Sequence, residues 1–203
     1  ALSAVAAIAK TLEKRDPYTS GHQDRVSQLS VAIARKLGWQ EDRIEGLRLG
    51  ALVHDIGKIY VPSEILNRPG RLTENEMGII RTHPGVGAEI LSESDFPWPL
   101  KDMVEQHHER MDGSGYPKGL SGDAIIAEAR IIAVADVVES IGSHRPYRPS
   151  LGIEAGLQEI QNGRGSKFDP EIVDACIAVI REDGFGYEPA GKAPPTPHLS
   201  PSS

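Results

Sequence analysis

The stretch that decides the fold is residues 44–58, which read IEGLRLGALVHDIGK. Leu47, Ala51 and Asp55 follow one another at intervals of four residues, so they lie on one face of a helix that ends by Gly57. The last member of this apolar stripe is an aspartate, and a histidine stands directly before it. The stripe therefore predicts a core-facing helix that carries two potential metal ligands toward the interior.

The rest of the chain has the same helical spacing of apolar residues. Thr73 is expected to cap a helix that has Glu76 in its first turn, and Pro84 is expected to separate that helix from the next. Sustained alternation of apolar and polar residues, which would indicate strands, is missing, and aromatic residues make up only 5% of the 203 residues. We therefore predict an all-α bundle with helices over residues 26–37, 44–57, 74–83, 86–91, 100–109, 124–141, 151–162 and 170–182.

Composition limits the class of protein and its partners. Residues 1–183 have the helical pattern of one domain, whereas residues 184–203 are rich in Pro and Ser and are expected to form a flexible tail. A single cysteine excludes an internal disulfide, and we find neither a membrane-spanning run nor a secretory signal, so a cytoplasmic protein without membrane contact is expected. A net charge of -7 argues against a nucleic-acid polymer as partner. The helical start suggests a fragment, which leaves an upstream sensory or receiver domain and a homodimer open.

Five of the 7 histidines and two aspartates form one ordered series along the chain. Imidazole and carboxylate are the usual ligands of Mn, Fe or Zn, and a site for two such ions needs about seven protein ligands with one carboxylate shared. Any one of these histidines alone is more simply a hydrogen-bonded core residue. Several polar groups that converge inward, however, are costly unless they share a partner. We therefore predict a buried metal site formed by His22, His54, Asp55, His83, His107, His108 and Asp136.

Two motifs in the series resemble a known family. Residues 54–58 read HDIGK, and residues 107–117 read HHERMDGSGYP. Together they resemble the HD-GYP domain, the cyclic-dinucleotide phosphodiesterase branch of the HD metal-dependent phosphohydrolases. The His-Asp pair alone is a weak signal, whereas the longer motif at this distance is specific. The resemblance extends over residues 3–182 and implies a helical bundle of the HD phosphohydrolase type.

The resemblance also implies how metals are held. One ion would be bound by His22, His54, Asp55 and Asp136, and a second by Asp55, His83, His107 and His108, with Asp55 as the bridging ligand. Iron or manganese is the usual metal of the family. Some members hold a third ion through a glutamate four residues before the first ligand histidine, and that position is Tyr18 here. Two divalent ions are therefore expected.

The remaining site residues follow from the same resemblance. Two such ions lower the pKa of a water between them and clamp the phosphoryl oxygens, so that the bridging aspartate and Lys58 are the expected catalytic residues. Lys58, Arg145 and Arg148 match the family's contacts to phosphate or guanine, and Gly115 and Tyr116 flank the substrate site. The plain alternatives are a solvated lysine at a helix end, arginines that only shape a loop, and a tyrosine that only shapes a turn.

The chain departs from the family after Asp136. The family usually has an aspartate at the position of Glu139, and another at the position of His144. Glu139 keeps a carboxylate one helical turn beyond Asp136, so we expect the change to affect at most the fine tuning of Asp136. None of the expected metal ligands is lost.

The expected function is metal-dependent hydrolysis of cyclic di-GMP to linear pGpG, through a hydroxide that bridges the metals. Further cleavage to GMP is less favoured without a third metal. Two alternatives stay open: a preference for 3′,5′-linked cyclic GMP-AMP, and a metal-containing receptor that binds the dinucleotide without hydrolysing it.

Overall fold

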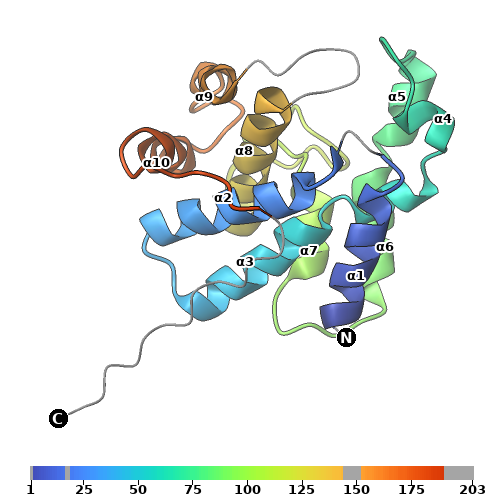
Figure 1. The fold of residues 1–203 in the computed structure, drawn as a ribbon, viewed down its shortest axis with the longest axis horizontal. Helices are drawn as coiled ribbons and strands as arrows, with labels where there is room; N and C mark the ends of the chain where they lie inside the picture. Colours follow the sequence, from blue (N-terminus) through green and yellow to red (C-terminus); the bar gives the residue numbers. More distant parts are fainter. Residues whose placement is uncertain (1, 17–18, 144–151, 190–203) are drawn as a thin grey trace.

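The computed structural model describes residues 2–16, 19–143 and 152–189. These ranges contain helices and no β-strand, and their only strand-like pairs are two isolated bridges, Asp112 with Ser121 and Arg164 with Phe168. The predicted all-α class is therefore confirmed (Figure 1). The helices are α1 (Leu2–Glu13), α2 (His22–Lys36), α3 (Glu41–Val53), α4 (Ser63–Leu66), α5 (Glu74–Ile80), α6 (His83–Ser92), α7 (Leu100–Gln106), α8 (Ala127–Gly142), α9 (Ile153–Asn162) and α10 (Pro170–Arg181), with 3-10 turns η2 (Ile56–Tyr60) and η3 (Gly122–Ala124).

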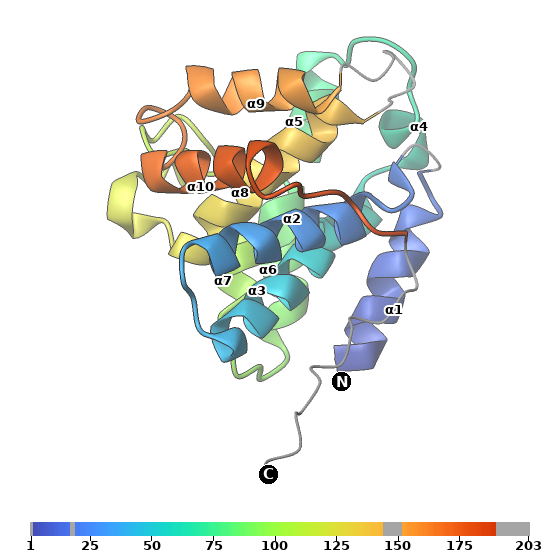
Figure 2. The ribbon, with the colours of Figure 1, turned by 60° about the vertical axis from the view of Figure 1, so that its left-hand side comes forward.

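Four helices form the centre of the bundle. Helix α2 packs against α3 and α8, and α7 packs against α3, α6 and α8. Helices α9 and α10 cover α8 on one side, whereas α1 lies against α3 and η2 on the other (Figures 1 and 2). The apolar stripes predicted from spacing meet in one core, in which Leu29, Leu47, Met103 and Ile132 are completely or almost completely buried.

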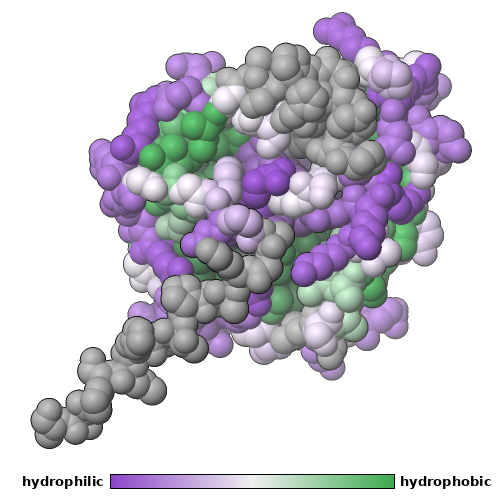
Figure 3. All heavy atoms as spheres, in the orientation of Figure 1, coloured by the Kyte–Doolittle hydropathy of each residue, from purple (hydrophilic) through white to green (hydrophobic). Residues whose placement is uncertain are grey.

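The face shown in Figure 3 is mostly hydrophilic. Apolar surface is visible there at the upper left, where Figure 1 places α9 and α10, and in patches at the right and lower right. The large hydrophobic residues that are exposed in the described ranges are scattered, namely Ile8, Ile59, Tyr60 and Ile79. Among the described helices, none combines the length and the apolar character needed to cross a membrane.

Local sequence signals place some helix ends correctly, among them the first residues of α5, α7 and α10. The ends expected at residues 57, 83 and 109 are wrong, because α3, α5 and α7 end at Val53, Ile80 and Gln106. The Thr73 hydroxyl accepts a hydrogen bond from the Glu76 amide, and the Glu76 carboxylate accepts one from the Thr73 amide, so the predicted capping box is formed. The expected break at Pro84 is wrong in its position. Helix α6 starts at His83 and includes Pro84 in its first turn, where the missing N–H of proline has no helical partner to lose.

One glycine brings two parts of the predicted site together. A Cβ atom at Gly57 would lie 1.9 Å from the backbone oxygen of His83 and 2.7 Å from the backbone nitrogen of Gly87. The backbones of η2 and α6 therefore approach each other more closely than any side chain at this position allows. This contact sets the His54-Asp55 pair beside the first residue of α6, His83.

The described part of the predicted tail, residues 184–189, lies along α2. The Gln28 side chain accepts a hydrogen bond from the Glu188 amide at 2.8 Å and donates one to the Glu188 carbonyl at 3.0 Å. Phe185 and Tyr187 pack against the main core. Residues 190–203, the rest of that tail, lie outside the described residues.

Candidate metal centre

The seven predicted ligands gather from five helices into two adjacent groups. Each group brings one ligand atom per residue to within 4.8 Å of the others, and five of the seven residues are buried. The residues stand at the start of α2, directly after α3, at the start of α6, directly after α7 and in the middle of α8. One group is Asp55, His83, His107 and His108, and the other is His22, His54 and Asp136.

Asp55 lies between the two groups and turns one oxygen toward each. Its Oδ1 lies 3.2 Å from His83 Nε2 and 3.6 Å from His107 Nε2. Its Oδ2 lies 3.5 Å from His54 Nε2 and 4.0 Å from His22 Nε2. Burial opposes ionisation of this carboxyl, but the neighbouring His54 and Lys58 hold its pKa well below the usual range. The Asp55 carboxylate is thus ionised, and its position between the two groups allows it to serve both.

Three of the histidines have the same tautomer-fixing contact. Nδ1 of His54, His83 and His107 lies 2.6 Å from the backbone oxygen three residues earlier in each case. A carbonyl oxygen only accepts, so Nδ1 carries the proton and Nε2 presents its lone pair to the cluster. Burial lowers the pKa of His107 to about 4, and the neighbouring His54 and His83 add to this, which keeps the ring neutral as a metal ligand must be.

His54 provides the test of whether a metal fits. Its Nε2 is buried, lies 3.4 Å from Asp136 Oδ1 and 3.5 Å from Asp55 Oδ2, and makes no hydrogen bond in the described structure. A buried polar atom without a partner is costly. Imidazole nitrogens and carboxylate oxygens are also the donors that borderline divalent cations prefer. The donor set and the unpaired nitrogen therefore fit a divalent metal.

His22 is held differently, by a carboxylate. Its Nδ1 makes a close contact with Glu139 Oε2, and its Nε2 lies 2.9 Å from Asp136 Oδ1. Glu139 is buried and also accepts a hydrogen bond from Arg25 Nε at 2.7 Å. Burial raises the pKa of Glu139, but His22, Ser143 and Arg25 together lower it to about 2, so the group is a carboxylate.

The role expected of Glu139 thus needs correction. Glu139 contacts His22 rather than Asp136, and the residue that approaches Asp136 is Ser140, whose Oγ lies 3.5 Å from Oδ1. Neither contact follows from the family motif. The burial of Glu139 could be predicted from its position, because it stands one turn after Asp136 on an apolar helix and must therefore face inward.

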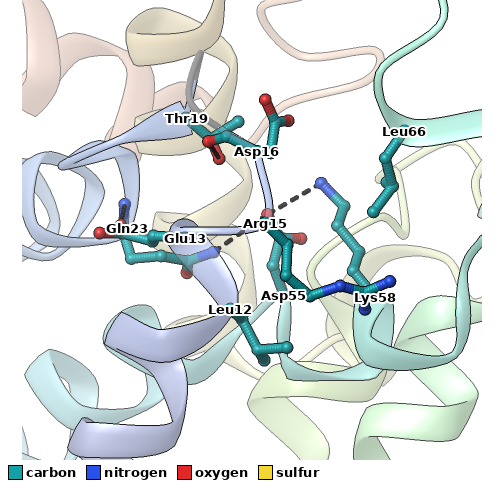
Figure 4. A pocket seen from close by; sticks show the side chains of 9 residues that line it. All are labelled: Leu12, Glu13, Arg15, Asp16, Thr19, Gln23, Asp55, Lys58 and Leu66. Atoms are coloured by element: carbon teal, nitrogen blue, oxygen red, sulfur yellow. Dashed lines mark hydrogen bonds and ion pairs between the residues drawn. The ribbon is translucent and has the colours of Figure 1, made fainter. Parts of the chain in front are cut away.

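Lys58 lies at the edge of the cluster. Its Nζ is 3.0 Å from Asp55 Oδ2, and Gln23 Nε2 donates to the same oxygen at 3.3 Å (Figure 4). The Lys58 and Gln23 side chains line a narrow cavity of about 30 Å³, together with Arg15 and Asp16. The Lys58 side chain is 31% exposed, so its ammonium contacts the Asp55 carboxylate and is also accessible from solvent.

The Gly-Tyr-Pro loop packs directly on the cluster. A Cβ at Gly115 would lie 2.3 Å from the His108 carbonyl oxygen, so this glycine is required for close approach, whereas Gly113 has the positive φ of 80° that a turn needs. The Tyr116 ring is stacked on His108, with centroids 4.8 Å apart. Buried Glu109 fixes the loop because its carboxylate accepts hydrogen bonds from the amides of residues 118 and 120.

Two predicted substrate residues, Arg145 and Arg148, lie outside the described residues, as does Tyr18. The same holds for His144. The structure therefore brings together the predicted ligands, Lys58, Gly115 and Tyr116, and leaves the roles of these arginines as predictions.

The chain is similar in sequence to known proteins. A family described as the HD domain matches residues 6–172. The cyclic di-GMP phosphodiesterase response regulator RpfG of Xanthomonas campestris is 42% identical over 172 residues, which cover 84% of this chain and 46% of the relative. The 3'3'-cGAMP-specific phosphodiesterase 3 of Vibrio cholerae is 37% identical over 88% of this chain and 38% of its own length. The chain thus spans less than half the length of these relatives.

Solved structures are similar in fold. The cyclic GMP-AMP specific phosphodiesterase V-cGAP3 of Vibrio cholerae superposes with a TM-score of 0.68 at 19% identity, covering 89% of this chain and 49% of that one. The HD domain of the phosphodiesterase PgpH of Listeria monocytogenes, in complex with cyclic-di-AMP, superposes with a TM-score of 0.60 at 24% identity over 90% of this chain and 99% of that one. At these identities the likeness establishes the helical fold alone.

Proposed function

The chain belongs to the HD-domain family, and from this premise we propose that it hydrolyses a phosphodiester bond of cyclic di-GMP with the help of divalent metal ions. The single observation that carries the proposal is the pair of ligand groups around Asp55. The name of RpfG as a cyclic di-GMP phosphodiesterase supports the choice of substrate.

Two ions, iron or manganese, are proposed as cofactors. One would be held by His22, His54, Asp55 and Asp136, and the other by Asp55, His83, His107 and His108, with Asp55 shared. Divalent ions at such a site supply Lewis-acid stabilisation of phosphoryl oxygens and make water more acidic. The absence of thiolate ligands in the set suits iron and manganese.

The chain's own residues would orient the reaction. The carbonyl contacts of His54, His83 and His107 keep each ring in one orientation, which limits the reorganisation that accompanies the reaction. Lys58 is proposed to stabilise the negative charge that develops on the phosphate, since its ammonium lies next to Asp55 and is partly exposed. Arg145 and Arg148 are proposed to bind phosphate or guanine through their planar donor groups.

A second substrate, 3′3′-cyclic GMP-AMP, is favoured by one observation. The cGAMP-specific phosphodiesterase 3 of Vibrio cholerae is 37% identical to this chain, close to the 42% of the cyclic di-GMP phosphodiesterase RpfG. The two substrates share the phosphodiester ring and differ in one purine. Base-contacting side chains, and not the metal centre, would therefore decide between them.

Partners and location are part of the same proposal. We expect the protein to act in the cytoplasm, with a receiver or sensory domain upstream and as a homodimer. The name of RpfG as a response regulator supports the receiver domain. Light scattering coupled to size exclusion of the full-length protein tests the dimer.

The activity is tested by product analysis. Protein loaded with Mn²⁺ or Fe²⁺ is incubated with cyclic di-GMP, and products are separated by chromatography beside an Asp55→Ala variant and a parallel 3′3′-cyclic GMP-AMP reaction. We expect pGpG from the wild type and intact substrate with the variant. The ratio of the two rates measures base preference, and accumulation of GMP would show a second cleavage. Unchanged substrate with metal bound, together with measurable dinucleotide binding, would instead identify a receptor.

A further inference from the structure

Gln23 reaches the carboxylate that lies between the two ligand groups. It stands directly after the ligand His22, in the first turn of α2. Its Nε2 donates a hydrogen bond to Asp55 Oδ2 at 3.3 Å, and Lys58 Nζ lies 3.0 Å from the same oxygen. Figure 4 shows the two donors approaching Asp55 from opposite sides. This oxygen is thus held between an amide of α2 and an ammonium of η2.

The orientation of the Asp55 carboxylate decides which ligand group each oxygen faces. Oδ1 lies 3.2 Å from His83 Nε2 in one group, whereas Oδ2 lies 3.5 Å from His54 Nε2 in the other. Rotation of the carboxylate about the bond that joins it to the side chain would withdraw both oxygens from these positions. A carboxylate oxygen accepts at two positions, so Oδ2 can take a donor on one side and a metal ion on the other. Donors to Oδ2 therefore fix the direction of both oxygens.

Gln23 is the more rigidly held of the two donors. Its backbone amide donates to Glu13 Oε1 at 2.9 Å, and the backbone amide of Gly21 donates to Glu13 Oε2 at 3.2 Å. The first amides of a helix have no intrahelical acceptor, so this carboxylate of α1 fixes the start of α2. Lys58 has a long, flexible side chain, and the proposed function directs its ammonium to the phosphate of the substrate. Gln23 is then the donor that remains on Asp55.

The other atom of the Gln23 amide group argues against a purely structural role. Gln23 Oε1 is buried and makes no hydrogen bond in the described structure. An unpaired buried acceptor destabilises a fold, and an apolar side chain of similar length would avoid this cost. The opposite orientation of the amide would place Oε1 against the Asp55 carboxylate, so only the observed orientation supplies a donor. The amide group therefore serves Asp55 rather than the stability of α2.

We propose that Gln23 is a positioning residue of the metal centre. It keeps each oxygen of Asp55 directed at its own ligand group when Lys58 engages the substrate. The inference rests on the proposed function for the bound ions and for the role of Lys58. Gln23 belongs to neither ligand group and acts through Asp55. Its loss therefore lowers the affinity for metal ions without removing a ligand.

The test compares two methionine variants of α2. Gln23→Met keeps the length of the side chain and removes its donor. The matched control is Gln28→Met, because Gln28 is also half-buried and belongs to neither ligand group. Its side chain makes hydrogen bonds to Asp24 and to the backbone of Glu188. Each protein is loaded with Mn²⁺ and titrated with a chelator of known affinity, and unfolding in excess chelator is followed by circular dichroism.

The two variants are expected to change different quantities. For Gln23→Met, we expect the Mn²⁺ affinity to fall by about tenfold or more, as when other hydrogen-bond partners of metal ligands are removed. Its unfolding temperature should change little, because the lost hydrogen bond is offset by removal of the unpaired Oε1. For Gln28→Met, we expect a lower unfolding temperature and an unchanged Mn²⁺ affinity.

A double variant tests whether the two donors act on the same oxygen. Because either donor can hold Asp55 Oδ2, the loss of Mn²⁺ affinity upon Gln23→Met should be larger in the Lys58→Ala background than in the wild type. Effects that simply add would contradict a shared action on Asp55 and would overturn the proposal.

Metal binding separates this inference from the activity. Weaker Mn²⁺ binding by Gln23→Met than by Gln28→Met supports the positioning role even if the wild type shows no turnover, an outcome that would remove only the proposed enzyme function. Wild-type Mn²⁺ affinity in Gln23→Met, or an equal loss of affinity in the two methionine variants, overturns the positioning role and leaves the proposed activity standing.

Discussion

Replacement of Glu139 by glutamine is expected to weaken metal binding by perturbing His22. The wild-type carboxylate contacts His22 Nδ1 and is itself fixed by Arg25 Nε at 2.7 Å. Glutamine has nearly the same shape but no charge, and its amide can rotate to present a donor to the imidazole. His22 would lose the partner that fixes its tautomer, and its Nε2 would no longer be held toward Asp136 and Asp55.

The expected size follows from the kind of contact removed. Loss of the hydrogen-bond partner of a ligand histidine typically lowers metal affinity about 10–100-fold, which corresponds to roughly 1.4–2.8 kcal/mol. The matched control is Glu128→Gln on the same helix. Glu128 is also buried and accepts a hydrogen bond from Arg43 Nε at 2.6 Å, but it belongs to neither ligand group.

In the assay, each protein competes for Mn²⁺ with a chelator of known affinity. The EPR signal of the ion measures how much Mn²⁺ the protein binds. Both variants lose a buried charge-assisted hydrogen bond, so both are expected to unfold at lower temperature by a similar amount. Only Glu139→Gln should lose Mn²⁺ affinity and change the EPR spectrum. Equal metal affinity in the two variants would refute the role given to Glu139 and would reduce it to a structural residue.

Three further outcomes are expected. Lys58→Ala should lower kcat/KM for cyclic di-GMP by about 10²–10³ through loss of charge stabilisation, with metal content by elemental analysis unchanged. Gly57→Ala should lower the unfolding temperature strongly or prevent folding, because its Cβ would meet the His83 oxygen at 1.9 Å, whereas Gly78→Ala, with open space around the Cβ, should be neutral or slightly stabilising by circular dichroism. Removal of metal by a chelator should destabilise the fold by about 2.7 kcal/mol for each bound ion, relative to protein at 100 Kd of free ion, and re-addition should restore it.

The helices could be predicted because they depend on the short-range spacing of apolar residues, and the seven His and Asp residues could be picked out because the motifs that contain them resemble the HD-GYP domain. The stripe of Leu47, Ala51 and Asp55 fixes which face of α3 is inside and directs Asp55, just beyond the helix, toward the cluster. Pro84 shows the limit of this reasoning. A proline is compatible with both a helix break and a first helical turn, and only the packing of α6 on η2 selects the second.

The cavity that lies beside His108 and is lined by Arg81, Arg110, Tyr116 and Lys167 could not be predicted from the sequence for a different reason. Arg110 belongs to the motif of residues 107–117, but Arg81 and Lys167 come from two other segments that no sequence pattern links to it. A backbone hydrogen bond from Met111 to Lys167 brings the last of them to the site. Contacts of this kind depend on the complete tertiary fold and leave no periodic signal in the sequence.

The ends of the helices explain why, among the buried histidines of the described ranges, His22 is the one that needs a carboxylate partner at Nδ1. The last carbonyls of a helix have no intrahelical donor. His54 and His107 directly follow α3 and α7, and their Nδ1 atoms use carbonyls in those last turns, while His83 uses Ile80 at the end of α5. His22 instead begins α2, where the free backbone groups are N–H donors that cannot accept its proton. An acceptor must therefore come from another helix, and Glu139 of α8 supplies it.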